Sequence, residues 1–315
     1  MNFIGIIPAR YASSRFPGKP LAMIGGKPMI QRVYEQTKKA LDYVVVATDD
    51  ERIFDCVTSF GGLAVMTSAD HPCGTNRCQE AYERCSLMVN ALIDKGELPE
   101  ELPNVKWSSH QDVVINIQGD EPFIQPEQIE AVKACFKLAG GQIATLVKPF
   151  SPQDSLQALR NPNSPKVVIA PLEKAAAFTK VSATFSLDAS SGVSPIASSV
   201  ASPADGIIGK AVYFSRSVIP YLRGVKEEEW LQEAERKGKP FYKHIGLYAY
   251  RADVLAAITR LPLSPLEQAE SLEQLRWIEN GYEIRVALTE QQTIGIDTPE
   301  DLQQAEVFLK QIEGK

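Results

Sequence analysis

The sequence lacks long hydrophobic runs and a leader segment. No stretch approaches the roughly twenty apolar residues of a membrane-spanning helix, so we expect no membrane insertion. The N-terminus enters strand-like sequence directly, without a charged leader or a small-residue cleavage site. That pattern predicts a cytoplasmic protein.

Paired cysteines and an excess of positive charge are also missing. The five cysteines are odd in number and show no C-x-x-C spacing, which argues against both a disulfide framework and a zinc site. The formal net charge is −6 and no basic stripe offsets it, which argues against a general nucleic-acid binder. A G-x-S-x-G motif, a Walker loop and a dinucleotide fingerprint are absent from the sequence.

The composition that remains is that of a globular protein. Hydrophobic residues make up 44% of the 315 residues and charged residues 23%. A chain of this length buries a full core, in one large domain or two modest ones.

Strand-like and helix-like segments alternate through the first half of the chain. Continuous β-branched runs such as YVVVAT (43–48) and DVVINI (112–117) are typical of buried parallel strands, and apolar residues at helical spacing lie between them. The expected strands are 3–7, 43–48, 63–66, 112–117 and 143–147, and the expected helices are 28–41, 52–60, 76–87 and 126–138. This alternation predicts a doubly wound, mostly parallel α/β sheet.

The pattern loosens in the middle of the chain and then returns. We expect a main domain formed by residues 1–149 and 251–315, and a smaller β-containing subdomain formed by 150–250. Two segments interrupt these domains. One is a polar surface excursion at 89–111, and the other is an Ala-, Ser- and Pro-rich flexible insertion at 171–206 with one short strand at 181–187. Further strands are expected at 166–169, 211–214, 244–250 and 283–288, a helix at 264–280, and a C-terminal helix capped by Thr298.

A basic loop follows the first strand. The stretch IIPARYASSRFPGKP (6–20) contains Arg10, Arg15 and Lys19 together with glycine and proline turn points. Loops at the carboxyl ends of strands in open α/β sheets bind ligands, and their backbone N–H groups supplement side-chain cations around a phosphate. A solvated basic loop is the alternative interpretation.

Carboxylates are expected at the same edge of the sheet. Asp120 and Glu121, in QGDEP, directly follow the 112–117 strand, and Asp297 precedes a helix N-terminus. A carboxylate near a bound phosphate is a natural Mg²⁺ ligand, although each aspartate alone is also explained as a helix-capping or turn residue. Together with the basic loop they favour phosphoryl or nucleotidyl transfer.

Other polar residues are weaker candidates individually. The segment Gly74–Arg77 either caps a helix or contacts a base edge. His244 begins a strand, where a structural histidine is the commoner role. Glu270, Glu273, Gln274 and Arg276 fit a solvated helix face.

Eight ordered motifs resemble one family over nearly the whole chain. They are IIPARYASSRFPGKPL, ATDD, GTNR, NIQGDEP, YFSRSVIP, KHIGLYAYR, PLEQAESLEQLR and GIDTPEDL. The sequence resembles the 3-deoxy-manno-octulosonate cytidylyltransferases, also called CMP-Kdo synthetases. The resemblance implies a nucleotide-diphospho-sugar transferase-like fold and a homodimer, with sugar contacts and dimerisation in the 150–250 subdomain. It also implies an Mg²⁺-dependent reaction of CTP with 3-deoxy-D-manno-octulosonate (Kdo), which gives CMP-Kdo and pyrophosphate for lipopolysaccharide biosynthesis.

The resemblance also assigns roles to residues. Arg10 and Lys19, assisted by Arg15, would hold the triphosphate, and Asp120 and Asp297 would bind Mg²⁺; Arg10, Lys19, Asp120 and Asp297 would form the catalytic set. The cytosine would contact the Ala9 backbone, Gly74, Thr75 and Arg77. The sugar acid would contact Gln118, Arg216, His244, Tyr248, Glu273 and Gln274. The chain departs from the family pattern at Cys73, Asn76 and Pro165, where serine, an acidic residue and valine are usual.

Two alternatives remain open at this stage. In the first, the acceptor of the cytidylate is another acidic sugar, such as a sialic acid. In the second, the chain is a catalytically silent paralogue that binds nucleotide. Retention of both aspartates and all three loop cations argues against the silent paralogue.

Overall fold

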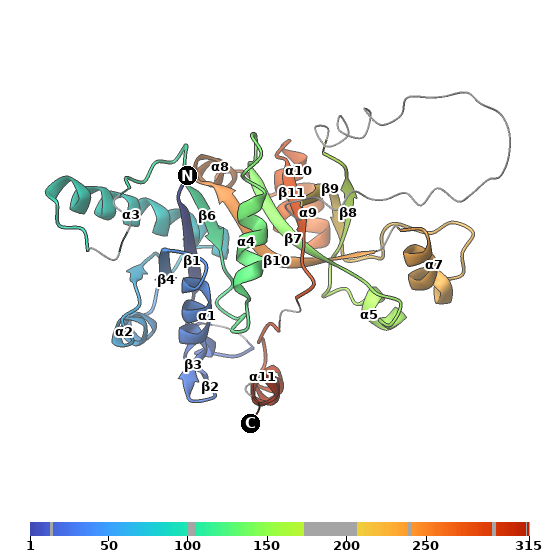
Figure 1. Cartoon of the computed structure of the whole chain (residues 1–315), viewed down its shortest axis with the longest axis horizontal. Coiled ribbons are helices and arrows are strands. Elements are labelled where there is room, and N and C mark those ends of the chain that lie inside the picture. Colours follow the sequence, from blue (N-terminus) through green and yellow to red (C-terminus); the bar gives the residue numbers. More distant parts are fainter. Residues whose placement is uncertain are drawn as a thin grey trace.

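A nine-stranded sheet forms the centre of the molecule (Figure 1). The computed structural model describes residues 1–12, 15–99, 102, 105–172, 207–238, 241–291, 294–312 and 314. Its strands lie in the order β5-β4-β1-β6-β10-β7-β11-β9-β8, and β2 pairs with β3 separately. The strands are β1 (Phe3–Ala9), β2 (Met23–Ile24), β3 (Lys27–Pro28), β4 (Tyr43–Thr48), β5 (Ala64–Met66), β6 (Val113–Asn116), β7 (Ile143–Pro149), β8 (Lys166–Ala170), β9 (Ile207–Ser215), β10 (Tyr242–Arg251) and β11 (Ile284–Leu288).

One half of the sheet is parallel, as the sequence predicts. Strand β1 lies between β4 and β6 and is parallel to both, and β5 continues this half outward. All residues of YVVVAT in β4 are buried, because helices cover both faces of this half. The carboxyl ends of β1 and β6 therefore meet at one edge.

The other half of the sheet contains antiparallel strands. Strand β10 lies between β6 and β7 and is antiparallel to both, and β9 is antiparallel to β11 and β8. A register shift between Ile245 and Tyr248 marks a β-bulge in β10. Strands β8, β9 and β10, from the predicted smaller subdomain, thus belong to the central sheet, and the division at residues 150 and 250 stays a prediction.

Helices cover the two faces of the sheet in separate sets. Helices α3, α8 and α10 pack on the face that carries Ile4 and Ile6, whereas α1, α2 and α4 pack on the face that carries Ile7 and Val44. The helices are α1 (Met29–Lys38), α2 (Glu51–Ser59), α3 (Gly74–Lys95), α4 (Pro126–Ala134), α5 (Leu156–Arg160), α7 (Trp230–Arg236), α8 (Ala252–Ile258), α9 (Pro265–Glu270), α10 (Glu273–Glu279) and α11 (Pro299–Ile312), with short 3₁₀ turns at Lys19–Leu21 and Glu227–Glu229.

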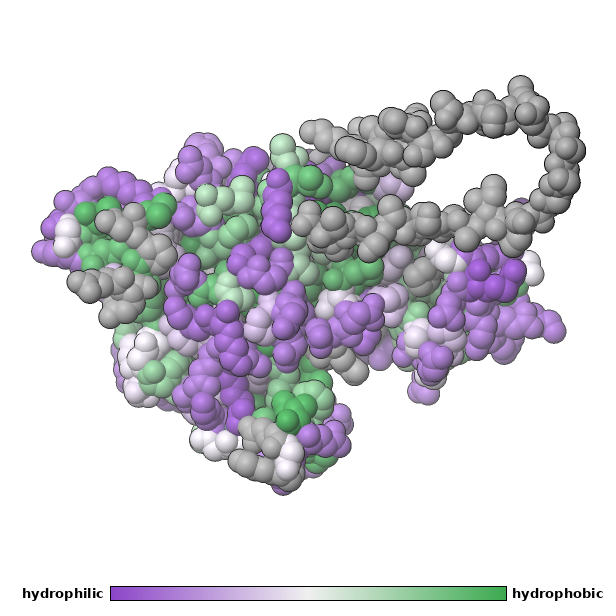
Figure 2. Space-filling model, viewed as in Figure 1, coloured by the Kyte–Doolittle hydropathy of each residue, from purple (hydrophilic) through white to green (hydrophobic). Residues whose placement is uncertain are grey.

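Two smaller clusters lie outside the main core. Helices α5 and α7 sit together at one end of the molecule and enclose Leu159, Trp230 and Phe241 (Figure 1). Helix α11 packs Leu309 against the β2–β3 pair through Ile24. The face shown in Figure 2 mixes hydrophilic and hydrophobic residues, and hydrophobic colour also lies over α11, whose Val307 and Ile312 are exposed.

Two sequence-based expectations are wrong in part. The predicted excursion 89–111 begins inside α3, which continues to Lys95 because Val89 is buried against the core. Trp107 in the same excursion is also buried, stacked on Tyr82. The predicted helix 264–280 is two helices, separated at Ser271, which adopts a left-handed φ of 50°.

The predicted flexible insertion 171–206 lies outside the described residues apart from 171 and 172, as does the strand expected at 181–187. Within the described part of the chain, we find no helix with the length and apolar character needed to cross a membrane.

Candidate active site

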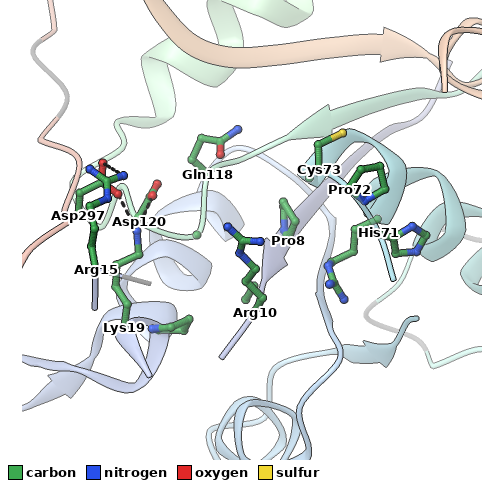
Figure 3. A pocket seen from close by; sticks show the side chains of 15 residues that line it. Pro8, Arg10, Arg15, Lys19, His71, Pro72, Cys73, Gln118, Asp120 and Asp297 are labelled. Carbon is green, nitrogen blue, oxygen red and sulfur yellow. Dashed lines mark hydrogen bonds and ion pairs between the residues drawn. The ribbon is translucent and has the colours of Figure 1, made fainter. Parts of the chain in front are cut away.

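A cavity of about 390 Å³ opens at the edge where β1 and β6 end (Figure 3). Most of the residues predicted to bind nucleotide or metal line it. They are Ala9, Arg10, Arg15, Lys19, Gly74, Arg77, Asp120 and Asp297, and the predicted sugar residue Gln118 lines it as well.

The backbone brings these segments together at short range. Gly119 follows β6 so closely that a Cβ atom on it would lie 2.8 Å from the carbonyl oxygen of Pro8, so glycine permits the turn to pass the end of β1. The N–H of Ile296 donates to the carbonyl oxygen of Asp120 at 2.9 Å, which fixes Asp297 beside the same turn. At Gly18, φ is 71° and the N–H donates to the Tyr11 carbonyl at 2.9 Å, which folds the basic loop back and orients Lys19.

Two carboxylates converge on one ammonium group. Lys19 Nζ lies 2.8 Å from Asp120 Oδ2 and 3.1 Å from Asp297 Oδ1. The guanidinium of Arg15 lies 3.1 Å from Asp297 Oδ2. The structure therefore confirms that the basic loop and both aspartates share one edge of the sheet. Glu121 does not line the cavity, and burial together with Asp120 raises its pKa to about 8.

This donor set suits Mg²⁺. Asp120 and Asp297 are close enough to contact the same cation, as their shared contact with Lys19 shows. The described residues contain no cluster of three or more His, Cys, Asp or Glu side chains, so the other ligands of a metal here would be water or phosphate oxygens. Mg²⁺ prefers that combination of one or two carboxylates with water and phosphate.

Arg10 and Arg77 differ in where their charges point. The exposed side chain of Arg10 extends into the cavity (Figure 3). Arg77 is buried, and its guanidinium donates to Thr67 Oγ1 at 2.6 Å and to Asp49 Oδ2 at 2.9 Å. Arg77 thus lines the cavity while its charge is neutralised by Asp49, directly after β4, and its guanidinium is also held by the Thr67 hydroxyl after β5.

The start of α3 is tied to α10 through Glu273. Thr75 Oγ1 donates to Glu273 Oε2 at 2.8 Å, and Cys73 Sγ donates to Glu273 Oε1 at 3.2 Å. Arg276 donates to Glu273 Oε1 at 3.0 Å. Burial, followed by the charge of Glu273, raises the pKa of Cys73 to about 11, which keeps the thiol protonated as a donor.

The remaining sugar candidates lie around β10. Tyr248 is buried and stacks edge-on against Trp277, and burial raises its pKa well above the ordinary value. His244 is in contact with Thr145 Oγ1 at 3.1 Å, and desolvation lowers its pKa to about 3, so the imidazole is neutral. Gln274 is buried on α10.

Arg216 lies away from the cavity walls. Its guanidinium donates to the carbonyl oxygens of Glu270 (2.6 Å), Pro162 (2.9 Å) and Ser271 (3.1 Å). It thereby stabilises the left-handed turn between α9 and α10. Glu270, expected on a solvated helix face, instead accepts hydrogen bonds from Ser215 Oγ and from the backbone N–H of Arg216.

Sequence reasoning assigned no role to two residues that line the cavity. His71 lines the cavity and contacts the carboxylate of Glu80, and Cys73 lines it at the N-cap of α3. Their position directly before the GTNR motif is the signal that would have identified them.

Comparisons with known proteins agree with this architecture. The family model described as Cytidylyltransferase matches residues 4–286. The chain is 54% identical over 315 residues, all of both chains, to a 3-deoxy-manno-octulosonate cytidylyltransferase of Phocaeicola vulgatus. It is 51% identical over 310 residues to one of Bacteroides thetaiotaomicron, which covers 98% of this chain and 99% of the relative.

Solved structures give the same result. A CMP:2-keto-3-deoxy-manno-octonic acid synthetase complexed with CTP aligns with a TM-score of 0.70 and 34% identity, over 99% of this chain and 100% of the other. A putative glucose-1-phosphate thymidylyltransferase from Bacillus anthracis aligns with a TM-score of 0.51 and 15% identity over 97% of this chain and 94% of the other, a likeness of fold alone.

The mixed α/β sheet, with a cation–carboxylate cavity at the ends of β1 and β6, defines a nucleotidyltransferase of the nucleotide-diphospho-sugar transferase-like fold. Within that class, the chain belongs to the cytidylyltransferase family, and more narrowly to its 3-deoxy-manno-octulosonate cytidylyltransferases.

Proposed function

We propose that the protein transfers cytidylate from CTP to Kdo and releases pyrophosphate. The observation that carries this proposal is the convergence of Lys19 with Asp120 and Asp297 in a cavity that Arg10 and Arg15 also line. The chain is 54% identical, over its whole length, to a relative named for this reaction, and this similarity supports the choice of both substrates.

The reaction exchanges one bond to phosphorus for another. The acceptor hydroxyl oxygen bonds to the α-phosphorus of CTP, the bond from that phosphorus to the oxygen bridging to the β-phosphate breaks, and pyrophosphate leaves in line. The hydroxyl proton passes to solvent. Catalysis of this step is mostly positioning and charge neutralisation, so no dedicated general base is required.

The loop residues act on the triphosphate in this proposal. Arg10 and Lys19, with Arg15, place positive charge beside the phosphates and the leaving pyrophosphate. Asp120 and Asp297 would hold Mg²⁺, which when bound supplies charge neutralisation at the α-phosphate and lowers the pKa of the attacking hydroxyl. The Ala9 backbone, Gly74, Thr75 and Arg77 form the cytosine side.

The acceptor side is built mainly on β10 and α10. Gln118 lines the cavity, and Tyr248, His244, Glu273 and Gln274 lie behind it on β10 and α10. Each terminal nitrogen of Arg216 uses one N–H group for a carbonyl oxygen and has a second one left. The remaining N–H groups would donate to the carboxylate of the sugar. The protein would act as a homodimer in the cytoplasm and supply CMP-Kdo for lipopolysaccharide assembly.

Pyrophosphate release tests the proposal. The purified protein is incubated with CTP and Mg²⁺ together with Kdo, with a sialic acid or with no sugar, and parallel samples receive a chelator. We expect release with Kdo alone and its loss on chelation, restored by excess Mg²⁺. Pyrophosphate release with the sialic acid alone would show that the acceptor is that sugar and not Kdo. CTP binding without any release would indicate a silent paralogue.

A further inference from the structure

A second cavity, of about 250 Å³, lies between α1, α11 and the turn that follows QGDEP. None of its lining residues lines the active-site cavity. The two cavities also differ in size, because that of the active site measures about 390 Å³. A ligand of the second cavity is therefore smaller than the nucleoside triphosphate proposed for the first.

Two cations on α1 and at its C-terminal end line the second cavity without a carboxylate partner. The guanidinium of Arg32 donates from Nε to the carbonyl oxygen of Ile24 at 2.6 Å and from Nη2 to that of Gly25 at 3.0 Å. A guanidinium has further N–H groups, which are left for a ligand. Lys39 Nζ donates to the side-chain oxygen of Gln36. In the part of the chain that the structure describes, neither cation forms an ion pair.

The carboxylate of Glu35 does not offset this charge. It is the only acidic side chain among the described residues that line the cavity. Its two oxygens accept from Lys27 Nζ at 2.9 and 2.7 Å, and one of them also accepts from Gln31 Nε2 at 2.9 Å. Lys27 thus neutralises Glu35, and the wall keeps the net positive charge of Arg32 and Lys39.

Apolar side chains form the rest of the wall. Phe123 and Leu309 are each 4% exposed, whereas Ile312 is 57% exposed at the end of α11. A Cβ atom on Gly25 would lie 2.2 Å from Leu309 Cδ2 and 2.6 Å from Arg32 Nη2, so the leucine and the guanidinium meet over this glycine. Positive charge and apolar surface are therefore adjacent, which matches an anion that carries an apolar group.

The cavity also adjoins both segments that carry the active-site aspartates. Pro122, which lines it, is two residues after Asp120, and α11 begins two residues after Asp297. The N–H of Ile296 donates to the Asp120 carbonyl oxygen at 2.9 Å and joins the two segments. A ligand that contacts α1 and α11 together would hold α11 against these segments.

We propose that this cavity binds a small amphipathic anion, namely a carboxylate or a phosphate monoester with a short apolar body, and that the bound anion holds α11 against α1. Arg32 and Lys39 would donate to the anionic head, and Leu309 and Ile312 would contact the body. Guanidinium and ammonium groups bind carboxylates and phosphates alike, so the experiment decides between the two heads. The proposal does not depend on the identity of the acceptor sugar.

Titration calorimetry tests the proposal with probes that separate the head from the body. Hexanoate carries both, acetate carries the head alone, hexanol carries the body alone, and hexyl phosphate replaces the carboxylate by a phosphate. Hydrogen exchange of the α11 amides, measured with and without hexanoate, locates the effect in the structure.

The variants are chosen at exposed positions, where a substitution leaves the fold intact. Lys39→Met removes a cation of the cavity, and the neighbouring Lys38→Met, outside the cavity, is its control. Ile312→Ser removes part of the apolar wall. Val307→Ser is its control, because Val307 is 56% exposed on the same helix and also lies outside the cavity.

We expect hexanoate to bind with a Kd on the order of 1 mM, as a ligand of this size allows, and acetate and hexanol to bind about tenfold more weakly or worse. Lys39→Met and Ile312→Ser should each weaken hexanoate binding by about fivefold, whereas the two controls should change it by less than about twofold. Hexanoate should slow hydrogen exchange of α11 in the wild-type protein and in both controls, and should slow it less in Lys39→Met at the same concentration. Tighter binding of hexyl phosphate than of hexanoate would support the proposal with a phosphate head, and the reverse order would support it with a carboxylate head.

Other results overturn the proposal. Equal binding of hexanol and hexanoate would mean that the cavity takes apolar molecules without an anion. Hexanoate binding that neither Lys39→Met nor Ile312→Ser weakens would place the anion elsewhere, and the absence of saturable binding would remove the site. Unchanged exchange of α11 on saturation with hexanoate would refute the bridging of α1 and α11. None of these results bears on pyrophosphate release, so the proposed function would stand.

Discussion

The two ends of the cavity hold their charges in different ways. At the loop end, Arg15 and Asp297 form an ion pair whose side chains are 65% and 47% exposed, on segments without regular structure. At the α3 end, the carboxylate of Glu273 is 25% exposed and accepts hydrogen bonds from buried Thr75 and Arg276. Charges at the loop end can change partners when a ligand arrives, whereas those at the α3 end are fixed by packing. The loop end is thus suited to neutralising charge, and the α3 end to holding shape.

The largest expected effect is a loss of activity, with little change in stability, when an aspartate at the loop end is replaced. Asp120→Asn and Asp297→Asn should each reduce kcat/KM by about 10³-fold, because each removes a carboxylate that would hold the metal beside the phosphates. The free energy of unfolding should change by less than about 1 kcal/mol, since these ion pairs are partly exposed. Steady-state kinetics and urea unfolding measure the two quantities. Glu35→Gln, which breaks the exposed pair with Lys27, is the control and should leave activity unchanged; near-normal turnover of either aspartate variant would refute the metal assignment.

At the α3 end, in contrast to the loop end, a substitution should lower the stability of the protein. Glu273→Gln should lower the free energy of unfolding by about 2 kcal/mol, because Thr75, Cys73 and Arg276 lose a charged acceptor. The KM for Kdo should rise as well. Chemical unfolding and acceptor titration check both effects. Glu267→Gln, which also contacts Arg276 but not α3, should leave the KM for Kdo unchanged; equal effects of the two variants would contradict the role of the α3 link.

The stability of the protein should depend on pH through the buried imidazole of His244. His244 has a pKa lowered by desolvation from 6.5 to about 3. The unfolded chain therefore binds a proton below pH 6.5 that the folded protein does not bind until about pH 3, so this stability is complete above pH 6.5 and is lost as the pH falls. The loss approaches about 1.4 kcal/mol per pH unit at most. Urea unfolding at several pH values should show a shallower slope for His244→Gln, and identical slopes would mean that the imidazole titrates normally.

The smallest effect should come from Arg15. Arg15→Met should raise the KM for CTP by about fivefold or less, because the Arg15 side chain is 65% exposed and an exposed charge contributes about 1 kcal/mol at most to an ionic contact, here with the phosphates. Raising the salt concentration should shrink the difference from wild type. Arg236→Met, which removes the exposed pair with Glu233 on α7, is the control. A loss comparable to that of Asp297→Asn would place Arg15 among the indispensable groups and narrow the contrast between the two ends.

Local patterns allowed the loop end to be predicted. Parallel β1 and β6 end at the same edge, so the strand patterns before the basic loop and before QGDEP already placed Lys19 near Asp120. The link from Glu273 to Thr75 could not be predicted, because 198 residues separate them and no local pattern records such a contact. Apolar periodicity shows that a strand is buried but not its direction, which is why β10 as an antiparallel neighbour of β6 was not foreseen. The break at Ser271 was missed because a residue other than glycine adopts the left-handed conformation there.

The position of β10 also has a consequence for the order of folding. β6 and β7 occur early in the chain, but they do not pair with each other; the strand that joins them ends at Arg251. During synthesis, the ribosome must therefore deliver about a hundred further residues before the gap between them closes, with unpaired N–H and C=O groups exposed on both edges. Closing such a gap needs contacts distant in sequence, which form slowly. The nascent chain is consequently most vulnerable to aggregation after β7 has emerged and before β10 is complete.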